Sequence, residues 1–196
     1  MTTLNKDVII LIGPIRSGKS TIAKLLSERL NLPRYGMDKL RFEYYKESDY
    51  NEVEAEKINN NNGFLALCEY RKPYDIYAVK RVLKDCEKGI IDFGGGLSVY
   101  ENEKHLQQIT TLLKPYRVVL LLPSENKEES IEILNVRMKE QEYQDYFSKK
   151  AIEDRKKLNH LFISHPSNQL LAKYTFYTKN KMPEETCNEI INYFNS

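Results

Sequence analysis

Positions 13–20 read Gly13-Pro14-Ile15-Arg16-Ser17-Gly18-Lys19-Ser20, which is the pattern G-x-x-x-x-G-K-S. The apolar run at residues 8–12 precedes this pattern, and a stretch with helical character at residues 21–30 follows it. A strand, a glycine-rich loop and a helix in this order gather backbone N–H groups and a helix N-terminus around one point, where phosphate oxygens bind. The sequence therefore predicts a P-loop that binds a nucleoside triphosphate.

The residues of this loop have separate tasks in the prediction. Lys19 is expected to reach the β- and γ-phosphates, and the Ser20 hydroxyl to face Mg²⁺, a hard cation that prefers oxygen ligands. The predicted cofactors are therefore ATP and Mg²⁺. A strand-to-helix turn that binds nothing is the alternative, and the flanking strand and helix count against it. The residues predicted to contact the nucleotide at the loop are Gly13, Pro14, Ile15, Arg16, Ser17, Gly18, Lys19, Ser20 and Thr21.

The size and composition of the chain favour one ordinary domain. Its 196 residues suffice for a buried core without disulfide or metal support, and they leave no room for a second full domain. A net charge of +2, with 30% charged residues of both signs, predicts neither a nucleic-acid nor a membrane partner. No apolar segment approaches the length of a membrane-spanning helix, and residues 1–7 show no signal-peptide pattern. The three cysteines, an odd number without a C-x-x-C pair, predict free thiols and a cytoplasmic location: Cys68, Cys86 and Cys187.

Apolar runs and longer helical stretches alternate along the chain. The runs that predict strands lie at residues 8–12, 34–37, 89–93, 118–122 and 174–178. The stretches that predict helices lie at residues 19–30, 39–45, 52–59, 74–87, 101–113, 127–138, 151–163 and 183–194. This alternation favours an α/β fold of the P-loop NTPase type, with three layers (α/β/α), a five-stranded parallel sheet and ligands at the carboxyl ends of the strands.

Residues 1–196 are predicted to form a single kinase domain, with substrate-binding helices at about residues 38–88 and a flap at about residues 139–150. The polar and unpatterned segment 139–150 fits either a mobile cover over the nucleotide or a plain solvated loop. Residues 59–63, which read Asn-Asn-Asn-Asn-Gly, predict a linker between helices.

An acid and three glycines follow the third predicted strand. Asp92 ends that strand beside the P-loop strand, where a carboxylate can hold the water shell of Mg²⁺; capping of the next turn is the alternative. Gly94, Gly95 and Gly96 carry no side chains, so a substrate can approach their backbone N–H groups; a flexible turn is the alternative.

Three further residues have both a functional and a structural interpretation. Asp38 follows the second predicted strand, where it can accept a proton from a substrate hydroxyl or cap the helix at residues 39–45. Arg71 lies four residues before Asp75, so it can hold an anionic substrate group or form a surface ion pair. Arg137 precedes the predicted flap, where its guanidinium can stack on adenine or compensate the helix dipole. The residues alone leave these alternatives open.

The other reactive residue types show no catalytic pattern. His105, His160 and His165 lack the spacing of metal ligands, and no Ser, Thr or Cys stands in a nucleophile signature. Metallohydrolase and catalytic-triad interpretations are therefore rejected.

Over nearly its whole length the chain resembles the shikimate kinase family of small P-loop kinases. The loop at residues 13–20 and the glycine triplet look like the family's nucleotide-side and substrate-side motifs. Asp38 falls at the family's substrate-hydroxyl acid, and Arg137 at its adenine-side arginine. The tail at residues 172–185 is similar to its closing strand and helix. The resemblance implies phosphoryl transfer from ATP to a substrate hydroxyl.

The substrate positions depart from that family. Its paired acids, D-x-D, read Gly-Met-Asp at residues 36–38, so the first, metal-side carboxylate is missing and Asp92 is expected to take its place. The family carries Gly-Phe-Arg in its substrate-binding helix, but residues 63–65 of this chain read Gly-Phe-Leu. Arg71 is then the candidate for that arginine, at a displaced position. Its second arginine for the substrate carboxylate falls near residues 164–165, Ser-His, where no arginine stands. These departures predict an acceptor other than shikimate.

Together the residues predict a kinase that transfers the γ-phosphoryl group of ATP to a hydroxyl of a small metabolite. The expected catalytic residues are Lys19, Asp38 and Asp92, and Ser20 and Asp92 are the expected metal-side residues. Asp38, Arg71 and the glycine triplet are expected to hold the acceptor. Three alternatives stay open: shikimate kinase proper, a nucleotide or nucleic-acid-end kinase, and a non-catalytic ATP-binding regulatory module.

Overall fold

The five predicted strands form one parallel sheet in the computed structural model, which describes residues 5–140 and 147–196. The strand order is β2-β3-β1-β4-β5, and every neighbouring pair runs parallel. This confirms the predicted α/β fold with a five-stranded parallel sheet. The strands are β1 (Asn5–Ile12), β2 (Arg34–Gly36), β3 (Gly89–Asp92), β4 (Tyr116–Leu122) and β5 (Tyr174–Tyr177).

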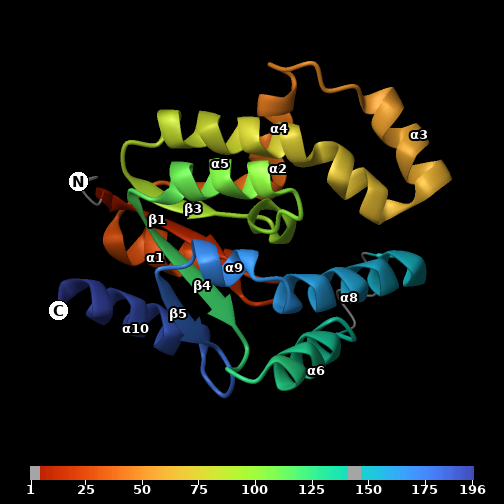
Figure 1. Ribbon diagram of the computed structural model, residues 1–196. Helices are drawn as coiled ribbons and strands as arrows, with labels where there is room; N and C mark the ends of the chain where they lie inside the picture. Colours follow the sequence, from red (N-terminus) through yellow and green to blue (C-terminus); the bar gives the residue numbers. More distant parts are fainter. Residues whose placement is uncertain (1–4, 141–146) are drawn as a thin grey trace.

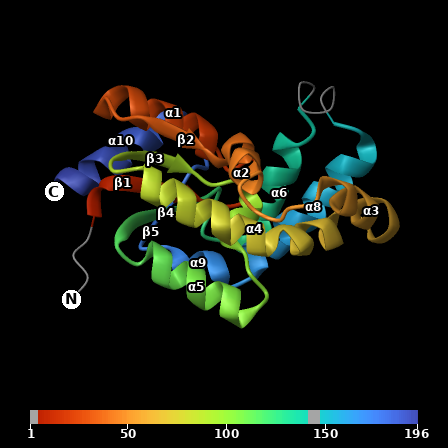
Figure 2. The same ribbon diagram turned by 90° about the horizontal axis from the view of Figure 1, so that it is seen from above.

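Both faces of the central strand β1 are buried, so helices cover the sheet on each side and the fold has three layers. Val8, Ile10 and Ile12 belong to one hydrophobic cluster, whereas Ile9 and Leu11 belong to another. A continuous apolar run is what a strand covered on both sides requires. The first cluster includes side chains of α2, α4, α5 and α9, and the second includes side chains of α1 and α10. Figures 1 and 2 show α4, α5 and α9 on one side of the sheet and α1 and α10 on the other. These helices are α1 (Lys19–Leu30), α2 (Met37–Tyr45), α4 (Phe64–Asp85), α5 (Glu103–Leu113), α9 (Ser167–Leu171) and α10 (Pro183–Asn195).

Helix α4 is longer than the sequence predicts. It begins at Phe64 and continues through Pro73, whereas the pattern predicted a helix only from residue 74. Proline removes one backbone hydrogen bond inside a helix. Leu67 and Ile76, on either side of Pro73, are nonetheless buried, and this packing keeps the helix continuous. The prediction was wrong here because tertiary packing outweighs the local proline signal.

The predicted linker at residues 59–63 is also wrong for most of its length. Helix α3 (Glu52–Asn62) includes all four asparagines, and Gly63 alone separates it from α4. Gly63 has φ of 85°, a conformation that residues with a Cβ rarely adopt, so the glycine makes the sharp reversal possible. Helices α3 and α4 therefore form a helical hairpin next to the sheet (Figure 1).

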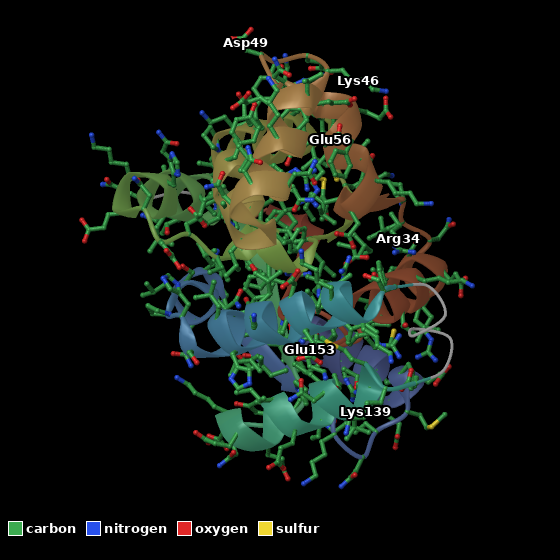
Figure 3. The ribbon with its side chains drawn as sticks, turned by 90° about the vertical axis from the view of Figure 1, so that its right-hand side faces the viewer. Arg34, Lys46, Asp49, Glu56, Lys139 and Glu153 are labelled. Carbon is green, nitrogen blue, oxygen red and sulfur yellow. The ribbon has the colours of Figure 1, made fainter. Side chains whose placement is uncertain are left out.

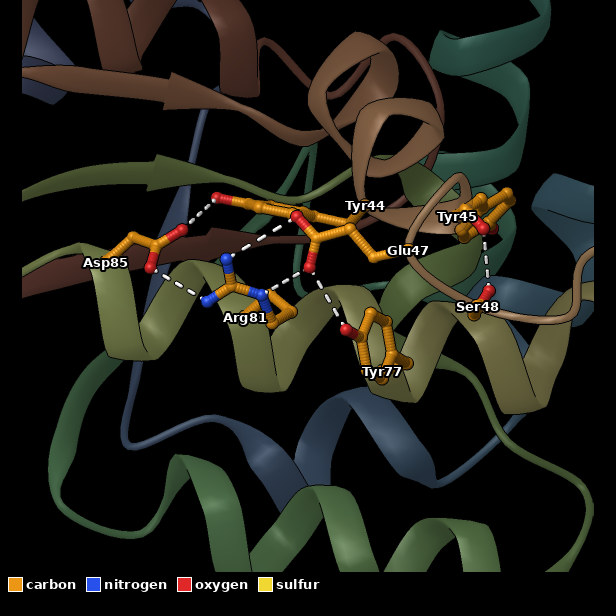
Figure 4. A network of polar contacts seen from close by, with 7 residues as sticks. All are labelled: Tyr44, Tyr45, Glu47, Ser48, Tyr77, Arg81 and Asp85. Atoms are coloured by element: carbon orange, nitrogen blue, oxygen red, sulfur yellow. Dashed lines mark hydrogen bonds and ion pairs between the residues drawn. The ribbon is translucent and has the colours of Figure 1, made fainter.

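A polar network ties the turn after α2 to α4 (Figure 4). Arg81 donates to Glu47 Oε2 at 2.7 Å and to Asp85 Oδ1 at 2.9 Å. Tyr77 donates its hydroxyl to Glu47, and Tyr44 donates its hydroxyl to Asp85, both at 3.0 Å. Helix α2 and the turn after it are therefore fixed against α4, the long helix that borders the site.

Two more helices, α6 (Lys127–Arg137) and α8 (Lys149–Ser164), extend beyond the carboxyl ends of the strands (Figure 1). Asn126 and Ser148 cap their N-termini by accepting from the N–H groups of Glu129 and Ala151. The predicted flap at residues 139–150 falls between them, and its residues 141–146 lie outside the described residues. Among the residues that the structure describes, no helix has the length and apolar character needed to cross a membrane.

Candidate active site

A cleft of about 920 Å³ lies at the carboxyl ends of the strands. Residues 15–22, which belong to the P-loop and the start of α1, form one wall. Residues of α2, α4, α6, α8 and α10, together with the short helix η1 (Gly95–Ser98), form most of the rest. The remaining lining residues lie between these helices: Glu140, Phe147, Thr178 and Lys181. In Figure 3 the α3–α4 hairpin, marked by Glu56, lies above α8, marked by Glu153. The predicted nucleotide loop and the predicted acceptor residues therefore border a single space.

The P-loop has the backbone that its glycines permit. Gly13 has φ of 139° and faces the Leu121 carbonyl so closely that a Cβ would collide with it. Gly18 has φ of 97° and is the residue before the first turn of α1. The hydroxyl of Ser17 is buried without a hydrogen-bond partner among the described residues. Since a buried hydroxyl is costly to leave unpaired, Ser17 fits the presence of a phosphate group in this loop.

Lys19 is more buried than expected for a loop lysine. Only 7% of its surface is exposed, and its ammonium donates to the Pro14 carbonyl at 2.7 Å. Burial lowers the pKa of Lys19, and the nearby carboxylates of Asp92 and Asp38 raise it in opposition. The ammonium thus lies within the field of both predicted catalytic acids, next to the loop that would hold phosphate.

Residues of distant helices fix the conformation of the loop. Ile15 donates its N–H to Asn159 Oδ1 at 2.8 Å, and Asn159 Nδ2 donates back to the Ile15 carbonyl at 3.0 Å. Arg16 and Arg137 make a similar exchange, each guanidinium donating to the other's carbonyl at 3.0 Å. Arg16 has φ of 67°, so these bonds hold a residue in an uncommon conformation. Asn159 was missed by sequence reasoning because no local spacing links it to a loop 144 residues away.

Arg137 lines the cleft as predicted, but much of its guanidinium is occupied. It donates to the Arg16 carbonyl and, at 3.4 Å, to the Thr178 hydroxyl. Burial, with the positive charge of Arg16, lowers the pKa of Arg137. From α6, Arg137 thus stabilises the P-loop directly through the Arg16 carbonyl. Its contact with adenine stays a prediction.

Asp38 lies in the first turn of α2 and lines the cleft. The N-cap of α2 is Gly36, and no side chain caps this end, so the capping interpretation of Asp38 is wrong. The Asp38 carboxylate packs on Gly94, where an added Cβ would collide with Oδ1. Only glycine fits at position 94 while Asp38 keeps this orientation.

The glycine triplet leads into a short 3-10 helix. Gly95 and Gly96 begin η1 and line the cleft, whereas Gly94 lies beneath Asp38 and does not. A Cβ on Gly95 would lie 3.0 Å from both Ile15 Cγ1 and the Phe162 ring. The small size of Gly95 therefore lets the P-loop and α8 pack against this turn, and contact of the triplet with a substrate stays a prediction.

Asp92 ends β3 beside the P-loop strand, as predicted, but it does not line the cleft. Asp92 is 5% exposed, and its carboxylate accepts a hydrogen bond from Arg34 Nη2 at 2.9 Å. A Cβ at Gly36, where the related kinases carry their first paired acid, would lie 3.9 Å from this Arg34 nitrogen. Of the two metal-side residues, only Ser20 lines the cleft, and the described residues hold no group of three or more potential metal ligands. The Ser20 hydroxyl in the cleft is an oxygen ligand of the kind that Mg²⁺ accepts.

Arg71 and Asp75 do not form the surface pair that their spacing allowed. Arg71 donates through Nε to the Tyr50 hydroxyl at 3.1 Å and lies over the Phe42 ring at 5.3 Å. Asp75 is 3% exposed and accepts from Arg41 at 3.3 Å and from the Tyr45 hydroxyl. Arg71 keeps the predicted position in the cleft, and Arg41 joins it there as a cation that the sequence did not single out.

Arg155 and Lys173 are the two cations that the sequence offers as replacements for the missing substrate arginine, and Arg155 lines the cleft. Its guanidinium lies 3.8 Å from the centre of the Phe147 ring and 5.8 Å from that of Phe64. These contacts link α8 to the start of α4 at the border of the cleft. Lys173, in contrast, donates to the Lys114 carbonyl and does not line the cleft.

Comparisons with known proteins agree with this geometry at the level of the fold. No protein-family model and no curated protein sequence matches the chain. A shikimate kinase from Acinetobacter baumannii, solved with shikimate, has a TM-score of 0.63 at 17% identity, over 99% of this chain and 94% of that one. The chain has the fold of shikimate kinases and related small P-loop kinases.

Two other solved structures show the breadth of this group. A shikimate kinase from Aquifex aeolicus matches with a TM-score of 0.56 at 23% identity, over 96% of each chain. A gluconokinase from Sinorhizobium meliloti matches with a TM-score of 0.54 at 11% identity, over 98% of this chain and 93% of that one. The matched folds thus serve kinases with different small acceptors.

Proposed function

We propose that this protein is a P-loop kinase that transfers the γ-phosphoryl group of Mg-ATP to a hydroxyl of a small metabolite. The observation that carries the proposal is the single cleft in which the P-loop meets Asp38, Arg71 and the turn at Gly95. A nucleotide-binding regulatory module needs only the loop, whereas a kinase also needs an acceptor space beside the γ-phosphate. The described cleft offers that space.

The residues divide the work as phosphoryl transfer requires. The loose transition state of this reaction calls for alignment and charge stabilisation more than for covalent chemistry. The P-loop N–H groups and Lys19 hold and neutralise the phosphates, and Asp38 accepts the proton of, or orients, the acceptor hydroxyl. Mg²⁺, when bound, would neutralise phosphate charge. Ser20, which lines the cleft, would supply a hydroxyl oxygen to it, and Asp92 would act through its negative charge beside Lys19.

The part of the cleft that we assign to the acceptor has both charged and apolar lining residues. Arg41, Arg71 and Arg155 supply positive charge, and Phe64 and Phe162 supply apolar surface. A small polyol or sugar-like acceptor with one apolar face fits this lining. A nucleic-acid substrate is less well supported, because the balanced charge of the chain offers no basic stripe to follow a phosphate backbone.

A screen of hydroxylated metabolites for ADP release from Mg-ATP tests the proposal. We expect at least one acceptor to raise ADP release well above the rate with water, and Asp38→Asn to lower that turnover while nucleotide affinity is kept. Glu43→Gln is the matched control, because Glu43 is an exposed carboxylate of the same helix that pairs with Lys46. Nucleotide binding without acceptor-dependent turnover across the panel would favour the regulatory module instead.

A further inference from the structure

Lys72 is a buried lysine on α4 that lines the cleft next to Arg71. Only 4% of its surface is exposed. Its ammonium donates to the Gly96 carbonyl and to the Val99 carbonyl, both at 2.6 Å. A lysine is rarely buried unless its charge is matched by well-placed acceptors, since desolvation of an ammonium is expensive. The two short bonds to backbone carbonyls are the matching partners here.

The bonds from Lys72 belong to a set that fixes the whole glycine turn. Tyr100 donates its hydroxyl to the Leu97 carbonyl at 2.9 Å, and its ring lies 4.8 Å from the Lys72 ammonium. The Tyr100 N–H donates to the Ser167 hydroxyl at 3.3 Å. The carbonyls of residues 96, 97 and 99 are therefore all held by buried side chains from outside η1.

The opposite side of the same turn faces the reacting groups. Gly94 supports the Asp38 carboxylate, and Gly95 packs against Ile15 of the P-loop. A shift of the turn would therefore move Asp38, the proposed proton acceptor, relative to the P-loop. A rigid anchor behind the turn would keep both in line, because phosphoryl transfer depends on alignment.

We propose that Lys72 is a positioning residue for the phosphoryl acceptor: it anchors residues 94–99 to α4 and so holds Asp38 in line with the transferred group. This inference rests on the proposed kinase function. An apolar residue at position 72 would satisfy the packing of α4 but would leave the carbonyls of Gly96 and Val99 without their donors. The lysine therefore serves the site and not only the core.

The experiment compares Lys72→Met and Lys72→Gln with the parent chain and with Lys80→Met, a substitution at an exposed lysine of the same helix. Amide hydrogen exchange over residues 94–100, Mg-ADP affinity, and steady-state kinetics with the acceptor found in the screen are measured on each. For Lys72→Met we expect exchange in residues 94–100 about tenfold faster and kcat about tenfold lower, with Mg-ADP affinity and the KM for ATP within about twofold. Lys72→Gln, whose amide NH₂ group is a shorter and uncharged donor, should recover part of both effects, and Lys80→Met should change neither.

Several results would overturn the proposal. Unchanged exchange over residues 94–100 would show that Lys72 does not anchor the turn, and a lower kcat with unchanged exchange would mean that it acts on the substrate directly. Failure of both Lys72 variants to fold would assign the two bonds to global stability. If the parent chain turns over no acceptor, the proposed function fails, yet the exchange and nucleotide-binding measurements still decide whether Lys72 anchors the turn.

Discussion

Ile15 and Asn159 exchange two hydrogen bonds, so the P-loop is held from outside by a buried side chain of α8. Asn159 is 1% exposed, and both ends of its amide are used on the Ile15 backbone. The loop conformation that binds phosphate is therefore set partly by a helix that follows the flap region in the sequence. Nucleotide affinity should depend on this helix as well as on the loop.

Substitution Asn159→Leu should weaken nucleotide binding. It leaves a backbone N–H and a carbonyl of Ile15 without partners, at a cost of about 1–3 kcal/mol in unfolding free energy. We expect Mg-ADP affinity to fall about tenfold in isothermal titration calorimetry, since the N–H groups of the loop lose their fixed orientation. His160→Gln changes the exposed neighbour and should have no effect. Parent-like Mg-ADP affinity in Asn159→Leu would show that the loop holds its shape unaided.

Replacement of Lys19 by methionine should remove most phosphate affinity without loss of stability in the free protein. Methionine keeps the apolar stem and avoids the desolvation that lowers the pKa of the buried ammonium. Ligand at 100 times its dissociation constant stabilises the parent by about 2.7 kcal/mol, and this ligand-dependent shift in Tm should disappear. Lys24→Met, on the exposed face of α1, is the control and should keep the shift. An undiminished shift in Lys19→Met would contradict the role of Lys19.

Asp92→Asn should raise the Mg²⁺ concentration needed for half-maximal nucleotide binding. The substitution removes the only carboxylate at the end of β3, beside Lys19, and leaves Arg34 without its ionic partner. Titration of Mg²⁺ against fluorescence of a labelled nucleotide measures the change, and Asp49→Asn on the exposed turn after α2 serves as the control. If the Mg²⁺ titration does not move, Asp92 serves the Arg34 ion pair alone.

Stability at alkaline pH should depend on Tyr44. Burial and the Asp85 carboxylate raise its pKa to about 12, above the value near 10 of an unfolded tyrosine. A raised folded pKa contributes stability that is complete below pH 10 and is lost as the pH rises toward 12. Urea unfolding at pH 9, 10 and 11 should therefore show a smaller loss for Tyr44→Phe than for the parent, while the exposed Tyr193→Phe follows the parent. Equal losses in the parent and in Tyr44→Phe would contradict the assignment.

Local signals in the sequence predicted the sheet and the phosphate loop, because each depends on a contiguous segment. The run at residues 8–12 is apolar on both faces of β1, and the glycines of the loop sit where the backbone needs them. The anchors of the site were not predictable in this way. Lys72 stands before the helix predicted at residues 74–87, so its contact with η1 appears only once α4 is seen to begin at Phe64. Asn159 likewise contacts the loop only in three dimensions.

Shikimate should be a poor acceptor. A carboxylate bound by two arginines gains charge-assisted hydrogen bonds, but Ser164 and His165 stand where the second arginine of the related kinases falls, and His165 is engaged with Ser167 at 2.8 Å. Arg71 uses its Nε on Tyr50 and Arg41 is paired with Asp75, so these two guanidinium groups are only partly available to a substrate carboxylate. Loss of such contacts, each worth about 1.5–3 kcal/mol, lowers kcat/KM about a hundredfold or more.

Steady-state kinetics with ATP, Mg²⁺ and shikimate, beside the best acceptor of the screen, measure this difference. Efficient turnover at sub-millimolar shikimate would contradict the prediction and would point to Arg155, the cleft arginine stacked on Phe147. The variant Arg155→Gln then decides the matter. If Arg155 replaces the missing arginine, the substitution raises the KM for shikimate and leaves the KM for ATP unchanged, because the guanidinium points from α8 toward Phe64 at the start of α4.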